Sequence, residues 1–110
     1  MSLDPARGAE VPKTRPYVVV SRTEANDISS TVTVVPLSSV AGRATDRLVQ
    51  PLLCAKETHL PKDSRALCDL VRTIEKRRIR ETLGVIRGEL LVKIDRGLML
   101  HLELENYIKL

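Results

Sequence analysis

Two runs rich in β-branched residues, Tyr17–Val20 and Thr31–Val35, are separated by a short polar connection. Such runs predict neighbouring strands of one sheet. Arg15 leads into the first run, and Ser38 follows the second. Because antiparallel partners run in opposite directions, the pairing would bring the Arg15 guanidinium and the Ser38 hydroxyl to the same end of the sheet. A cation and a hydroxyl at one sheet end suit a phosphate.

The remaining apolar runs predict more short strands, and proline constrains two of them. Proline cannot donate to a ladder, so Pro36 should lie at the end of strand 31–37 or at a bulge, and Pro51 marks 48–55 as an edge strand. On its residues alone the charged run 72–81 predicts a solvated helical turn. Arg22–Asp27 predicts either a helical turn or a loop. The first run extends to a strand over Tyr17–Ser21, and further strands are expected at Ser2–Asp4, Ser64–Val71 (or a short helix there) and Thr82–Ile86.

The C-terminal segment allows two interpretations. The apolar positions Leu91, Ile94, Leu98 and Leu102 follow helical spacing, whereas leucines at every second position from Leu98 onward are typical of a strand. Gly97 would cost a helix roughly 1 kcal/mol relative to alanine. Because the helical spacing begins first, we favour a helix over 88–103. The whole chain, 1–110, is then one small β-rich α+β domain.

Composition narrows the classes of function. The chain has no Phe or Trp and two Tyr, so aliphatic side chains must build its core and a base-stacking platform is disfavoured. The formal net charge is +4, and arginine supplies most of the basic residues. The arginine fork matches phosphate or carboxylate bidentately, but a net charge of this size speaks only to non-specific binding.

The two cysteines, Cys54 and Cys68, stand in no CxxC motif and have no histidine at zinc-ligand spacing. We expect both to be free, buried thiols in a cytosolic protein, and we expect neither a metal nor a cofactor. No apolar run approaches the ~18–20 residues of a membrane span.

The chain has no Walker loop, GxSxG elbow or HExxH motif, which leaves arginine, hydroxyl and carboxylate chemistry. RNA is cleaved without metal when its own 2′-OH attacks the adjacent phosphate. The protein then supplies a proton acceptor, a proton donor and positive charge. Arg15 suits charge stabilisation, Ser38 can hydrogen-bond a phosphate oxygen, and Asp69 or Glu10 can accept a proton. Alternatively, Arg15 is a surface residue, Ser38 caps a turn, and Asp69 pairs with Arg72, Arg77 or Arg78.

Four stretches in order resemble one known family. They are LDPARGAEVPKTRPYVVVS with its D-P, G-x-E and R-P elements, TVTVVPLSS, KDSRALCDLVRTIEKRRI with its R-T-I run, and the C-terminal L-x-x-I-x-x-x-L pattern. Together they resemble the MazF/PemK toxins of bacterial toxin–antitoxin modules. The resemblance implies an SH3-like β-barrel with a C-terminal helix, working as a homodimer. It also implies metal-independent, sequence-selective cleavage of single-stranded RNA, and neutralisation by a cognate antitoxin.

The resemblance also assigns residues. The arginine of the R-P dipeptide falls on Arg15, the catalytic hydroxyl on Ser38, and an aspartate used by some members on Asp69. Family members carry more residues before the D-P dipeptide, so here Met1 falls inside the first strand, which should be shortened. The candidate RNA contacts are Glu10, Lys13, Ser39, Arg72 and Arg77.

Two alternative functions share this fold. A gyrase poison that resembles these toxins would act through its C-terminal helix end and would not need Arg15. An inactive barrel would bind antitoxin or RNA without cutting RNA.

Overall fold

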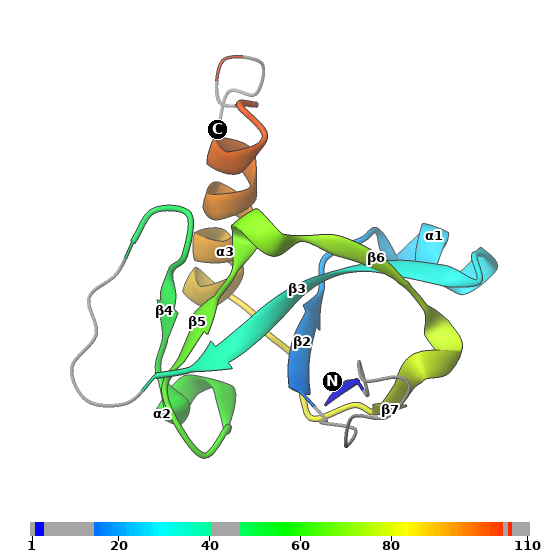
Figure 1. Cartoon of the computed structure of the whole chain (residues 1–110), viewed down its shortest axis with the longest axis horizontal. Coiled ribbons are helices and arrows are strands. Elements are labelled where there is room, and N and C mark those ends of the chain that lie inside the picture. The colour runs from blue at the N-terminus through cyan, green and yellow to red at the C-terminus, as the bar shows by residue number, and fades with distance from the viewer. Residues whose placement is uncertain (1, 4–14, 41–46, 105, 107–110) are drawn as a thin grey trace, which may run out of the picture.

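The computed structural model describes residues 2–3, 15–40, 47–104 and 106. They form a seven-stranded sheet of antiparallel ladders, followed in the chain by one long helix (Figure 1). The strands are β1 (Ser2–Leu3), β2 (Arg15–Val19), β3 (Thr31–Ser39), β4 (Leu52–Leu53), β5 (Ser64–Ala66), β6 (Arg72–Glu75) and β7 (Ile79–Glu81). The helices are α1 (Thr23–Ile28), α2 (Ala55–Thr58), α3 (Glu89–His101) and the 3-10 turns η1 (Cys68–Leu70) and η2 (Lys76–Arg78).

The sheet is organised around β3, which pairs with β2 along one edge and with β6 and then β5 along the other. The strand order is β4-β5-β3-β2-β1-β7, with β6 beside β3. Alternate β3 side chains serve two cores, because successive side chains of a strand point to opposite faces. Val35 and Leu37 pack under α3, while Val32 and Val34 pack on the other face with Tyr17 and Ile74.

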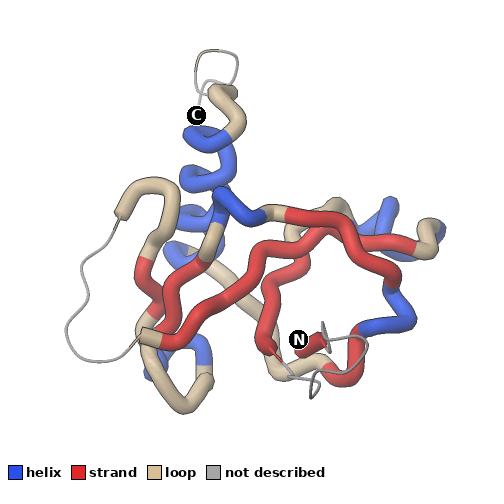
Figure 2. The backbone as a smooth tube through the Cα atoms, viewed as in Figure 1, coloured by secondary structure: helices blue, strands red, loops and turns tan. Residues whose placement is uncertain are grey.

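The expected SH3-like β-barrel with a C-terminal helix is confirmed, although the barrel is open. The turn η2 joins β6 to β7, so residues 72–81 curve from β3, which pairs with β6, to β1, which pairs with β7 (Figure 2). The ribbon ring seen in Figure 1 is filled by the cluster of Tyr17, Val32, Val34 and Ile74. No ladder between described residues closes the sheet from β4 to β7.

The prediction that Pro36 ends a strand or sits at a bulge is wrong, because Pro36 lies inside β3. On the β2 side the Val20 N–H donates to the Thr33 carbonyl at 2.9 Å. The Tyr17↔Pro36 pair therefore falls between hydrogen-bonded pairs, which alternate along a ladder, and needs no N–H. On the other side the β6 ladder stops at Val34, the β5 ladder starts at Leu37, and Pro36 occupies the gap.

Two predictions near the charged run need correction. The solvated helical turn predicted for 72–81 is present only at its centre, as the 3-10 turn η2, and the flanking residues form β6 and β7. These flanks are strands because Ile74 is buried in the second core, β3 pairs with β6, and β1 pairs with β7. Residues 82–86 form no strand. They line an apolar pocket of about 240 Å³ together with residues of β2 and Leu91 of α3.

The other expected elements are present, several of them shorter. The helix over 88–103 is confirmed as α3, and the predicted edge strand 48–55 is confirmed as β4 alone. Ser64–Val71 contains both a strand, β5, and a short 3-10 turn, η1. β1 pairs with both β2 and β7, while Asp4 lies outside the described residues. Arg22–Asp27 contributes most of α1.

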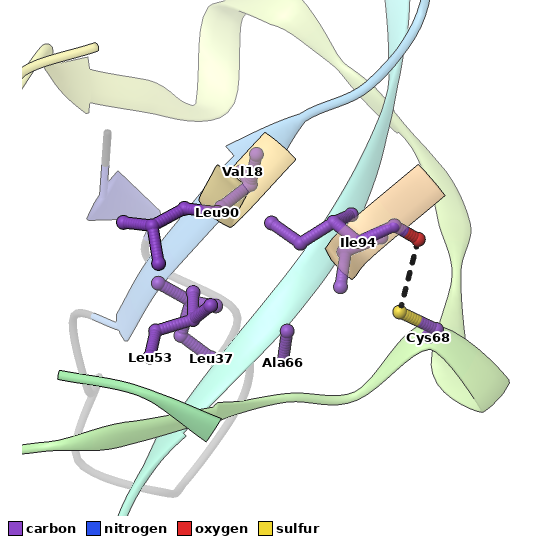
Figure 3. Packing of buried hydrophobic residues seen from close by; sticks show 8 residues of the cluster. Val18, Leu37, Leu53, Ala66, Cys68, Leu90 and Ile94 are labelled. Carbon is purple, nitrogen blue, oxygen red and sulfur yellow. Dashed lines mark hydrogen bonds between the residues drawn. The ribbon is translucent and has the colours of Figure 1, made fainter. Parts of the chain in front are cut away.

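The two cysteines differ in exposure. Cys68 is buried as expected, but Cys54 is exposed because it precedes the short surface helix α2. The Cys68 thiol donates a hydrogen bond to the Ile94 carbonyl, with 3.6 Å between Sγ and oxygen (Figure 3). Burial raises the pKa of Cys68 to about 11, with further increases from the charges of Asp69 and Asp95. The thiol is therefore neutral and serves packing.

The α3 helix packs over the core with Leu90 and Ile94, and Gly97 is also buried on this helix. Figure 3 shows Leu90 and Ile94 beside Val18, Leu37, Leu53, Ala66 and Cys68. A Cβ at Gly97 would lie 2.7 Å from Cys68 Sγ and 3.2 Å from the Leu48 carbonyl oxygen. The glycine that weakens the helix locally is thus required for helix α3 to approach turn η1.

We expect Gly97→Ala to destabilise the protein by about 1–3 kcal/mol, because overpacking costs more than the ~1 kcal/mol that alanine gains in a helix. Urea unfolding measures the change. Gly84→Ala is the control, since its Cβ would meet nothing within 4 Å. Adding Cys68→Ala to Gly97→Ala should recover part of the loss. A Gly97→Ala protein as stable as the Gly84→Ala protein would contradict this account of the helix contact.

Candidate active site

A pocket opens at the end of the β2–β3 ladder. The last pair in that ladder is Tyr17↔Pro36, and beyond it lies an open pocket of about 420 Å³. Arg15 enters the pocket wall from β2, and Ser38 enters it from β3. Both residues are exposed. The lining residues are Arg15, Pro16, Leu37, Ser38, Ser39, Leu60, Pro61, Lys62 and Ser64.

The lining has the composition of an anion site. Arg15 and Lys62 bring positive charge, three serines bring hydroxyl groups, and no carboxylate lines it among the described residues. Ser64 is buried, and its hydroxyl donates to the Lys62 carbonyl at 3.3 Å. Ser38 and Ser39 are exposed, so their hydroxyls are available to a bound phosphate.

The sequence interpretation did not include Lys62. This residue lies in the connection between α2 and β5, next to Asp63. The Asp63 carboxylate accepts a hydrogen bond from the Ala55 N–H at 2.8 Å, and its carbonyl accepts one from the Val40 N–H at 2.9 Å. These two bonds fix the connection against the end of β3. The sequence offered only the position of this lysine two residues before the predicted strand 64–71, because the pairing of that strand with Ser38 and Ser39 appears only in the structure.

Asp69 lies apart from the pocket lining, on the turn η1. Its Oδ1 accepts a hydrogen bond from Gln50 Nε2 at 3.0 Å. The Gln50 carbonyl in turn accepts a hydrogen bond from Arg65 Nη1 at 2.9 Å. Asp69 is therefore connected to β5 through Gln50, and its assignment as a catalytic residue stays a prediction.

Of the predicted RNA contacts that the structure describes, Arg72 and Arg77 do not line the pocket. Arg72 is exposed at the start of β6, and Arg77 forms an ion pair with Glu75 at 2.8 Å. Ser39 does line the pocket beside Ser38. Glu10 and Lys13 lie outside the described residues. The structure thus brings together Arg15, Ser38 and Ser39 from the predicted set.

Two further properties concern metals and membranes. Within the described ranges, no three or more His, Cys, Asp or Glu side chains gather in a way that could hold a metal ion. None of the helices in the described part of the chain is long and apolar enough to span a membrane.

The fold is that of solved MazF toxins. The TM-score is 0.75 to a MazE–MazF structure from Deinococcus radiodurans, at 22% identity over 93% of this chain and 90% of that one. It is 0.73 to a mycobacterial endoribonuclease in complex with its cognate antitoxin, at 21% identity over 94% and 89% of the two chains. At this identity the likeness establishes the fold.

Sequence comparison establishes the family. Residues 1–102 match the family model of PemK-like, MazF-like toxins of type II toxin–antitoxin systems, and the chain belongs to that family. It is 36% identical over 109 residues to endoribonuclease MazF9 of Mycobacterium tuberculosis, covering 94% of this chain and 91% of that protein. It is 28% identical over 106 residues to endoribonuclease MazF of Staphylococcus epidermidis, covering 96% and 87%.

Proposed function

We propose that this toxin is a metal-independent, sequence-selective endoribonuclease that cleaves single-stranded RNA in the bacterial cytoplasm and so inhibits translation and growth. The observation that carries the proposal is the pocket shared by Arg15 and Ser38 at the end of the β2–β3 ladder. Family membership and the endoribonuclease relatives support it.

The chemistry follows from the groups in the pocket. The ribose 2′-OH gives its proton to a base, the role predicted for Asp69 or Glu10, and its oxygen forms a bond to the adjacent phosphorus. The bond from phosphorus to the 5′ oxygen of the next nucleotide breaks, and that oxygen takes up a proton. The products are a 2′,3′-cyclic phosphate and a 5′-hydroxyl. The Arg15 guanidinium stabilises the charge that develops on the phosphate oxygens, and the Ser38 hydroxyl donates a hydrogen bond to one of them. Arginine stays protonated, so it supplies charge and not a base.

We propose that the toxin works as a homodimer, and an exposed apolar surface supports this. Four large apolar side chains of the segment 82–86 and of α3 have exposed fractions from 36% to 68%; they are Leu83, Val85, Leu91 and Val92. The first three line the apolar pocket of about 240 Å³. A patch of this kind on a small protein marks an interaction surface.

A cognate antitoxin is the second protein partner, with an extended segment that occupies the site where RNA binds.

The Arg15→Ala variant tests the proposed chemistry. In EDTA the wild type should cut single-stranded RNA and leave cyclic phosphate ends. Arg15→Ala should lose cleavage by about 10²–10³-fold or more, because preorganised charge on the developing phosphorane is lost. Gel analysis of a long phage RNA measures both. Arg22→Ala, an exposed arginine at the start of α1, is the matched control and should cut normally.

Cleavage that persists in the Arg15→Ala protein would overturn the assignment of Arg15. A wild-type protein that leaves RNA intact and inhibits supercoiling by gyrase would instead establish the gyrase-poison alternative. A wild-type protein that leaves RNA intact but binds antitoxin would establish the inactive barrel.

The Asp69→Asn variant tests the proton acceptor. The asparagine oxygen still accepts the hydrogen bond from Gln50, but an amide cannot take up a proton at neutral pH. We therefore expect cleavage to fall by about 10²-fold or more while urea unfolding is unchanged. Asp95→Asn on α3 is the control and should cut at the wild-type rate. Normal cleavage by Asp69→Asn would exclude Asp69 as the base and leave Glu10.

The Val85→Asp variant tests the homodimer. Val85 is 68% exposed in the chain, so a charge there should fold normally but carry a desolvation cost in an apolar interface. Light scattering after size exclusion should give twice the chain mass of 12.3 kDa for the wild type and one chain mass for Val85→Asp. Ile28→Asp, on α1 and 89% exposed, should stay dimeric. A dimeric Val85→Asp protein would place the interface elsewhere.

A further inference from the structure

Arg65 stands directly across the β3–β5 ladder from Ser38. Directly opposed residues of an antiparallel pair put their side chains on one face, with Cβ atoms about 4.5–5.5 Å apart. The neighbouring pair, Leu37↔Ala66, faces the core under α3. Arg65 and Ser38 therefore face the opposite, outer side of the sheet.

Arg15 belongs to the same face. It is two residues from Tyr17, which packs in the cluster on the side of the sheet away from α3. The strand order β5-β3-β2 places β3 between the two arginine-bearing strands. Ser38 thus has an arginine strand on each side, with Arg15 on β2 and Arg65 on β5.

Contacts on both sides of β5 hold Arg65 in place. Its backbone is paired on both sides, with Ser38 of β3 and with Leu52 of β4. Its side chain is half-buried, and Nη1 donates to the Gln50 carbonyl at 2.9 Å. The Gln50 side chain is fixed in turn by its hydrogen bond to Asp69. The guanidinium is therefore positioned before any ligand arrives, which lowers the entropic cost of a contact.

The charge of Arg65 is available to a ligand. A guanidinium has five N–H donors, and within the described residues this one makes a single hydrogen bond, to a neutral carbonyl. It forms no ion pair with a described carboxylate, unlike Arg77, which is paired with Glu75. A fixed cation with no carboxylate partner among the described residues, beside an exposed hydroxyl, fits a phosphate group.

We propose that Arg65 contacts the RNA phosphate held by Ser38, from the side opposite Arg15. This inference rests on the proposed function and adds a second guanidinium to the site. The phosphate is then held between two planar forks, so Arg65 contributes to RNA affinity and to stabilising the charged transition state. Because the fork geometry matters, lysine replaces Arg65 only in part.

The test compares Arg65→Gln and Arg65→Lys with Arg22→Gln, which removes the same charge near the other end of β3. Cleavage sites of the wild type are first mapped on a long phage RNA in EDTA. A short RNA with one mapped site is used for kcat/KM, and the same RNA with deoxyribose at the scissile nucleotide is used for binding. Arg65→Gln should lower kcat/KM by about 10–100-fold and reduce the salt slope of binding by about 0.7, the value for one lost phosphate contact.

Arg65→Lys should keep the wild-type salt slope and lose about five- to tenfold in kcat/KM, because the charge remains and the bidentate fork does not. This variant decides the question if Arg65→Gln fails to fold, as judged by thermal unfolding. Arg22→Gln should match the wild type in rate and slope.

Two patterns would overturn the proposal. Folded Arg65→Gln that binds and cuts like Arg22→Gln removes Arg65 from the site, and so does Arg65→Lys at the full wild-type rate. In both patterns the proposed function stands if the wild type cuts RNA and the Arg15→Ala variant does not. A wild type that leaves RNA uncut overturns the proposed function and this inference together.

Discussion

Strand β3 pairs with three other strands, and the sheet can do this only because β3 changes partner beside Pro36. Up to Val34 its outer edge belongs to β6, and from Leu37 onward it belongs to β5. Pro36 has no N–H to offer, and the position it occupies requires none on the β2 side. The residues after the change, Ser38 and Ser39, are the ones that emerge from the core into solvent.

The candidate active site is a consequence of this change of partner. Once the β2–β3 ladder stops, Arg15 and Ser38 line a pocket instead of pairing with each other. β5 supplies Ser64 to the pocket lining, and Lys62 lies two residues before that strand. Arg65 of β5 stands across the ladder from Ser38. Rigid strands on both sides of a hydroxyl hold cations in place, and preorganised charge of this kind is the main contribution a protein can make to metal-free phosphoryl chemistry.

The sequence predicted what local pattern controls. The β-branched runs predicted β2 and β3, and their antiparallel direction placed Arg15 and Ser38 at one end. Leucine and isoleucine spacing predicted α3. Long-range pairing could not be predicted from local pattern. Residues 72–81 look helical locally, but β6 forms because it pairs with β3 and β7 forms because it pairs with β1. Arg65 was missed for the same reason, since only the register of β5 on β3 shows that it faces Ser38. From the sequence Gly97 only weakens a helix, because the close approach of Cys68 that leaves no room for a Cβ there is a long-range contact.

The central claim is that Arg15 and Ser38 act on one phosphate, and a double-mutant cycle on RNA cleavage in EDTA tests it most directly. Rates are measured for the wild type, Arg15→Ala, Ser38→Ala and the double variant on one mapped site. Residues that act as a unit are strongly non-additive, so the double variant should lose little more than the worse single variant. A double variant whose loss equals the product of the two single losses would contradict a shared site.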